Sequence, residues 1–198
     1  DMLVGTQMLA KGHDFPNVTL VGVVSVDAGL SLPDFRSAER TFQLITQVAG
    51  RAGRGERAGR VLIQTYHPKH YALKHACAQD YAGFYDEEIR YRRSMSYPPF
   101  VALASLLVHG EDFNRTQGTA AELKRALEEA NTDRACRILG PAPAPLARLR
   151  GEHRIQILIK SRSRPRLREL IDMAYADVNE RGGDLRSVNL EIDPINLM

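Results

Sequence analysis

The chain has 198 residues, of which 43% are hydrophobic, and its formal net charge is +3. That length is sufficient for one large domain or two small ones with their own cores. The sequence contains no run of roughly 18 apolar residues and no charged-then-apolar leader, which excludes a membrane-spanning class and predicts a soluble, cytoplasmic protein.

The first third of the chain alternates strand and helix patterns. Residues 2–5 and 18–26 are β-branched and almost continuously apolar, which predicts strands buried on both faces of a parallel sheet. Residues 37–49 have helical periodicity with Ser37 as the expected N-cap, and residues 60–66 return as a strand. This alternation is typical of the α/β class.

A polar helical stretch follows at residues 70–94 and is predicted to be one long helix. Tyr97-Pro98-Pro99-Phe100 should end it, since proline cannot continue a helix and restricts the residue before it. We therefore expect three parts: residues 1–69, a linking segment at 70–100, and a C-terminal domain at 101–198.

The C-terminal part predicts the order β-α-β-β-α-β. Its expected elements are strand 101–109, helix 115–130, strand 137–139, strand 154–160, a helix carrying Leu167, Leu170, Ile171, Ala174 and Val178, and strand 187–192. The two middle strands bracket a loop rich in proline and arginine. An α+β domain of this order is the expected fold.

One short run places a glutamine and two arginines at the spacing Q-x-x-G-R-x-x-R, with Gln47, Gly50, Arg51 and Arg54 at the fixed positions. This spacing resembles motif VI of the superfamily 2 helicases. A transferring γ-phosphoryl group spreads negative charge over several oxygens, and a guanidinium can neutralise it with two hydrogen bonds at once. The resemblance implies that Arg54, together with Arg51 and Gln47, acts in catalysis as an arginine finger.

A second run, Thr6 to Asp14, has the pattern T-x(5)-G-x-D and resembles motif V of the same superfamily. In that motif a strand end presents a hydroxyl and backbone amides to a DNA phosphate. The resemblance implies that Gly12 and Asp14 face the nucleotide. It also implies that Thr6, Gln7 and Lys11 face DNA.

Beyond these two motifs, longer segments of the sequence are similar to the PriA family of primosomal replication-restart helicases. The matching segments are residues 5–23, 34–40, 47–55, 97–100 and 138–144, with a terminal Asp193-Pro194. The resemblance implies part of a RecA-like helicase lobe 2 followed by a C-terminal domain similar to ribosomal protein S10. It also implies an ATP-dependent 3′-to-5′ DNA helicase that loads the primosome at stalled forks.

The parts needed to bind ATP are missing from the sequence. It has no G-x-x-x-x-G-K-[ST] phosphate loop and no D-E-x-H-type box, so it lacks an ATP cradle. We expect a C-terminal piece of a longer motor protein that is inactive alone. The resemblance implies ATP and Mg²⁺ for the intact protein, and as partners forked and single-stranded DNA, single-stranded-DNA-binding protein and primosome proteins.

No metal site is predicted. Cys77 and Cys136 stand alone and are expected to be buried, and the spacing of His67, His70 and Cys77 matches no usual zinc ligand set. The resemblance implies a zinc-binding insertion only in a region upstream of this sequence.

An arginine-rich stretch at residues 148–168 contains Glu152 as the one acidic residue before Arg168. Strand alternation predicts that Arg154, Gln156, Leu158 and Lys160 share one face. Arginines at the start of the last helix oppose its dipole unless an anion lies nearby, which favours anion binding over a solvated surface. We expect Arg154, Lys160, Arg162 and Arg164 to bind DNA or an acidic partner, mainly through phosphate or carboxylate contacts.

Two other functions fit part of the sequence. A non-enzymatic module that binds nucleic acid or protein would need only the C-terminal part. Another superfamily 2 DNA translocase would also carry Q-x-x-G-R-x-G-R. The sequence of residues 5–23 favours the replication-restart family instead.

Overall fold

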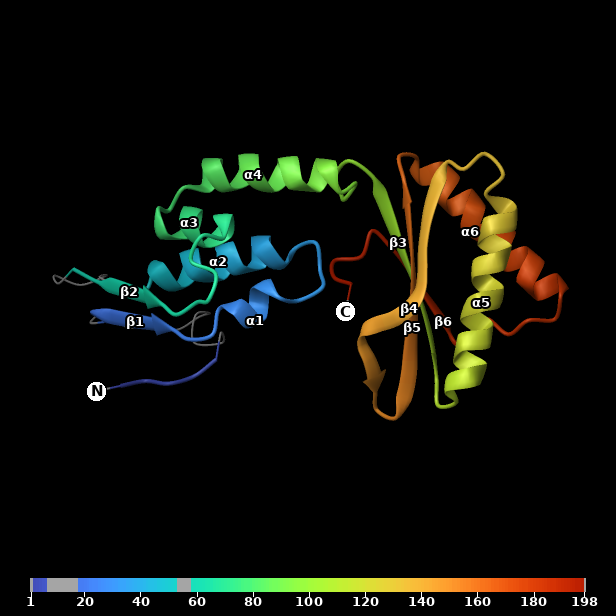
Figure 1. Ribbon diagram of the computed structural model, residues 1–198, viewed down its shortest axis with the longest axis horizontal. Helices are drawn as coiled ribbons and strands as arrows, with labels where there is room; N and C mark the ends of the chain where they lie inside the picture. The colour runs from blue at the N-terminus through green and yellow to red at the C-terminus, as the bar shows by residue number, and fades with distance from the viewer. Residues whose placement is uncertain (1, 7–17, 53–57, 198) are drawn as a thin grey trace. The chain divides into compact units, whose positions relative to one another are not determined.

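The computed structural model describes residues 2–6, 18–52 and 58–197. It confirms a mixed α/β protein with a small parallel sheet and a four-stranded antiparallel sheet (Figure 1). The chain forms two compact units, Asp1–Tyr91 and Arg92–Met198, which are described separately. No helix in the described ranges is long and apolar enough to span a bilayer.

The first unit combines a two-stranded sheet with short helices. Its elements are β1 (Leu20–Val23), α1 (Asp27–Leu30), α2 (Ser37–Ala49), β2 (Arg60–Ile63), α3 (Tyr71–Cys77) and the first turns of α4 (Tyr81–Ser94). The strands pair in parallel, with Leu20 opposite Arg60. The core lies among α2, α3 and α4, where the Phe42 and Phe84 rings stack with centroids 4.1 Å apart.

Two strand predictions in this unit were wrong. Residues 2–6 form no strand, and residues 18–26 contain only the short β1. The prediction of burial on both faces for residues 18–26 also fails, because the side chain of Leu20 in β1 is 58% exposed. Only β1 and β2 pair in the described part of this unit, so no second layer covers both of their faces.

Helix α2 has the predicted bounds, but its N-cap differs from the prediction. Arg36 occupies the cap position, and the Ser37 hydroxyl instead donates a hydrogen bond to the carbonyl of Leu32 at 2.7 Å. Asp34 orders this start, since its buried carboxylate accepts hydrogen bonds from the Arg36 amide at 2.8 Å and from Arg40 at 3.0 Å.

The single helix predicted for residues 70–94 is two helices. The chain turns between α3 and α4 at Gln79, whose φ of 53° lies in the left-handed region and cannot continue a helix. Asp80 accepts a hydrogen bond from the Gly83 amide at 2.8 Å, and its other oxygen lies 3.0 Å from His75. Cys77, expected to be buried, is exposed at the end of α3.

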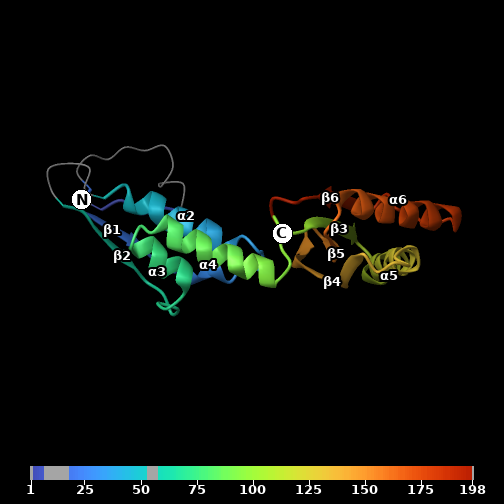
Figure 2. The same cartoon turned by 90° about the horizontal axis from the view of Figure 1, so that it is seen from above.

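The second unit follows the predicted order of elements. They are β3 (Ala102–Gly110), α5 (Phe113–Ala130), β4 (Cys136–Leu149), β5 (Glu152–Ser161), α6 (Arg164–Glu180) and β6 (Val188–Ile192). The strand order is β4-β5-β3-β6, and all described pairings are antiparallel. In Figure 2 α5 and α6 lie side by side against this sheet.

The core of this unit confirms the periodicity read from the sequence. Alternate residues of β3 and β5, such as Leu106 and Ile157, are fully buried against α5 and α6. All five predicted core residues of α6, Leu167, Leu170, Ile171, Ala174 and Val178, are buried. Cys136 is buried, as predicted.

The loop predicted between residues 139 and 154 is in fact the end of a long hairpin. β4 continues to Leu149 and pairs with β5 through a tight turn at Arg150 and Gly151, whose φ values are 53° and 91°. Register shifts after Leu139 and after Pro143 accommodate the prolines. At the first shift Gly140 has φ +98°, and a Cβ there would lie 2.6 Å from the Gln156 carbonyl oxygen.

Candidate nucleic-acid interface

Five of the residues predicted to contact nucleotide or DNA lie outside the described residues. They are Gln7, Lys11, Gly12, Asp14 and Arg54.

The other three motif residues belong to the first unit. Gln47 is exposed in the last turn of α2, and Arg51 is half-buried in the turn that follows, where its amide donates to the Val48 carbonyl at 3.0 Å. Thr6 is exposed in an extended segment. The C-terminal end of a helix carries partial negative charge, so Arg51 occupies a position that favours a cation.

The arginine-rich stretch of the second unit does not form one patch. Arg154 lies opposite His109 near the beginning of β5, whereas Lys160 lies opposite Leu103 near its end. Six residues of strand separate them by about 20 Å. The structure therefore has a hairpin end, with Arg148, Arg150 and Arg154, and an α6 end, with Arg137, Arg162, Arg164, Arg166 and Arg168.

Lys160 does not project into solvent, although strand alternation placed it on a basic face. The residue is 6% exposed, its ammonium donates to the Met95 carbonyl at 3.0 Å, and it lies 3.5 Å from the centre of the Tyr97 ring. Burial, together with repulsion from Arg137, lowers the pKa of Lys160. This lysine attaches the segment before β3 to the sheet.

The rest of that predicted face is also partly covered by the chain itself. Gln156 donates hydrogen bonds to the Ser105 hydroxyl at 2.9 Å and to the Leu197 carbonyl at 3.2 Å. Leu197 is buried. Period-two alternation identified the face, but it could not indicate that the C-terminal segment would cover it.

At the α6 end, carboxylates of the protein partner two of the helix-start arginines. Arg164 pairs with Asp193 at 2.7 Å, and Arg166 pairs with Asp133 at 2.8 Å and with Glu169 at 3.0 Å. The Arg166 hydrogen bond lowers the pKa of Asp133 to about 2. These partners offset the unfavourable position of the arginines near the helix dipole, so a bound anion is not needed to explain them.

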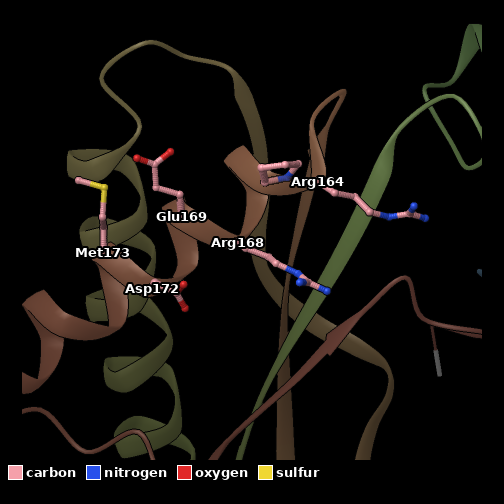
Figure 3. A pocket seen from close by; sticks show the side chains of 6 residues that line it. Arg164, Arg168, Glu169, Asp172 and Met173 are labelled. Carbon is pink, nitrogen blue, oxygen red and sulfur yellow. The ribbon is translucent and has the colours of Figure 1, made fainter.

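Arg162 and Arg168 remain exposed, and within the described ranges their side chains form no hydrogen bond or ion pair. Arg168 also lines a shallow surface pocket of about 570 Å³ on α6. Figure 3 shows Arg164 and Arg168 extending toward the same side of this helix, with Glu169 and Met173 on the other. Pro165 and Asp172 also line the pocket.

At the hairpin end, Arg148 and Arg150 are exposed, and Arg154 makes only a long 3.4 Å hydrogen bond to the Leu146 carbonyl. Glu152 is hydrogen-bonded to His109 at 3.1 Å. The described residues contain no group of three or more His, Cys, Asp or Glu residues arranged to hold a metal. Both ends present exposed guanidinium groups, which are suited to phosphate or carboxylate.

The family model described as "Primosomal protein N C-terminal domain" matches residues 93–195. The chain is 49% identical over 171 residues to replication restart protein PriA of Bacillus subtilis, covering 86% of this chain and 21% of that protein. It is 39% identical to the Treponema pallidum protein of the same name, over all of this chain and 30% of the relative. The Haemophilus influenzae protein is 37% identical over 99% of this chain and 27% of its own length. The chain thus spans between a fifth and a third of these relatives.

Proposed function

Because this chain belongs to the PriA family and matches its C-terminal region, we propose that it is the C-terminal portion of an ATP-dependent 3′-to-5′ DNA helicase that restarts replication at stalled forks. The observation that carries the proposal is similarity to a replication restart protein over the whole chain. The chain's own Q-x-x-G-R-x-x-R run supports it. The intact protein would act in the cytoplasm and load the primosome.

Within the first unit, residues 1–69 would contribute to ATP turnover as the end of a RecA-like lobe 2. Arg54 is the proposed arginine finger, with Arg51 and Gln47 beside it in sequence. Gln47 in the last turn of α2 and Arg51 in the turn that follows lie four residues apart at the C-terminal end of one helix, which supports a shared role for these two residues. Gly12 and Asp14 would couple to the nucleotide, with ATP and Mg²⁺ bound by the intact protein.

Residues 101–198 of the second unit would bind DNA or a protein partner as an S10-like domain, and the segment 70–100 would join this domain to the lobe. The order β3-α5-β4-β5-α6-β6 supports that likeness. Arg154, Arg162 and Arg164 remain proposed anion contacts, together with Thr6, Gln7 and Lys11 in the first unit. Lys160 is reassigned to an internal anchor because it is buried. The proposed partners are forked and single-stranded DNA, single-stranded-DNA-binding protein and primosome proteins.

Arginine-finger chemistry gives a direct test in the intact protein. Arg54→Ala should leave nucleotide affinity nearly unchanged and lower ATP turnover by about a thousandfold or more. Arg60→Ala, which removes an exposed arginine of β2 instead, is the matched control. Normal fork unwinding by the Arg54→Ala protein would reassign that residue to a structural role.

The chain of 198 residues should by itself release no phosphate from ATP, with or without single-stranded DNA, because its sequence contains no phosphate loop. Turnover that persists after repeated purification would contradict the proposal.

A further inference from the structure

The outer edge of the four-stranded sheet is a strand with arginines and no carboxylates. β4 is the terminal strand in the order β4-β5-β3-β6, so no described strand pairs with its outer side. Residues 136–151 include three arginines, Arg137, Arg148 and Arg150, and no Asp or Glu. We infer that this segment, the β4 edge, binds the phosphate backbone of duplex DNA.

The arginines of the β4 edge are available to a ligand. All three are exposed, and in the part of the chain that the structure describes their side chains form no hydrogen bond or ion pair. The carboxylates that flank the segment in sequence are already engaged. Asp133 accepts hydrogen bonds from Arg166 at 2.8 Å and 3.1 Å, and Glu152 is hydrogen-bonded to His109 at 3.1 Å. A polyanion along this edge would therefore meet cations without a free carboxylate among them.

The same edge is poorly suited to pair with another protein strand. Pro141, Pro143 and Pro145 have no amide hydrogen to donate, and two register shifts interrupt the strand. Prolines and bulges at a sheet edge oppose strand addition. The residues between Arg137 and Arg148 are mostly small and all uncharged. The sugar-phosphate backbone of DNA can therefore approach the β4 edge closely.

The spacing of the arginines fits a segment of DNA. Arg137 lies opposite Lys160 and Arg148 lies opposite His153, so seven residues of β5 separate the two positions. Because this offset is odd, the two side chains start from opposite faces of the sheet, and a ligand that contacts both must lie along the outer edge. At about 3.4 Å per residue the separation is about 24 Å. Phosphates of one strand in a duplex advance by about 3.4 Å per base pair, so a DNA segment of about seven base pairs is needed to reach both arginines.

Base chemistry favours a duplex over a single strand. Proteins that bind single strands without sequence preference rely on stacking of bases on aromatic side chains. The β4 edge contains no Phe, Tyr, Trp or His. A duplex hides its bases and presents phosphates, which these arginines can contact. This inference rests on the proposed role in DNA binding and specifies its surface and its ligand.

The test is a salt titration of the full chain with a blunt duplex of 16 base pairs. The three arginines of the β4 edge should contribute about −2.7 to the slope of log K against log salt, from about 0.9 per phosphate. Arg148→Ala/Arg150→Ala should reduce that slope by about 1.8 and Arg137→Ala by about 0.9. Lys124→Ala/Arg125→Ala is the control, because it removes the same charge from α5, at the half-buried Lys124 and the exposed Arg125, and should leave the slope unchanged.

A second arm varies the length and type of the ligand. A hairpin-capped stem of five base pairs should show a slope reduced by at least about 0.9, because it is too short to reach both ends of the edge. Equal slopes on the short and long duplexes would overturn the inference. A variant in which Arg137, Arg148 and Arg150 are all changed to Ala gives a second test. If it binds the long duplex normally but no longer binds a thymidine oligonucleotide or an acidic peptide, the inference is also overturned. Such a result would leave the Arg54 test of helicase function unaffected, because that test measures ATP turnover.

Discussion

The two units contain similar apolar strands, but the side chains of these strands are buried to different extents. Leu106 of β3 is fully buried, whereas Leu62 of β2 is 57% exposed. The difference follows from the layers: β3 lies inside a four-stranded sheet covered by α5 and α6, while β2 pairs only with β1 in the described residues. A strand-like sequence therefore contributes to stability only to the extent that other elements cover it.

The largest expected effect tests that contrast directly. Leu106→Ala should destabilise the second unit by about 2–5 kcal/mol, because it removes a buried side chain and leaves a cavity. Leu62→Ala should change stability by only about 0.5 kcal/mol. Hydrogen exchange of the β3 and β2 amides in the full chain would measure both. Equal costs at the two positions would refute the explanation by layers.

A smaller effect should define where the second unit begins. Residues 92–198 and residues 101–198 should each fold, but the shorter piece should be less stable by about 1–3 kcal/mol, because it leaves the buried Lys160 ammonium without the Met95 carbonyl and the Tyr97 ring. Urea unfolding of both pieces gives the difference. Introducing Lys160→Met into each should remove most of that difference, and a persistent gap would show that Lys160 is not the anchor.

The smallest effect is a pH dependence at the α6 end. The hydrogen bond from Arg166 lowers the pKa of Asp133 to about 2 in the folded protein, from its ordinary value of about 3.8. Its contribution to stability should therefore be complete above about pH 4 and be lost as the pH falls toward 2. Asp133→Asn should flatten this part of the stability curve relative to the unaltered chain. Thermal unfolding between pH 2 and pH 5 would detect this flattening. Asp172→Asn, at an exposed position of α6, is the control.

Much of the candidate site was visible in the sequence, but its arrangement was not. The arginine-rich stretch was identified, yet the hairpin distributes it between two ends of β5. Arg137 was missed because it precedes that stretch. The signal that could have revealed it is the absence of Asp and Glu across residues 136–151. Partner carboxylates such as Asp193 lie far from Arg164 in sequence, so local patterns could not indicate which arginines were already paired.

The sequence by itself determined the order of elements in the second unit, the core face of α6, and the family, because periodicity and motif spacing are local properties. Only the tertiary structure decided that β4 would continue through its prolines, that α3 and α4 would separate at Gln79, and that Lys160 would be buried. Each of these outcomes depends on contacts or backbone geometry that residue type alone does not specify. A strand pattern shows which residues share a face, but the elements packed on that face decide whether it meets solvent.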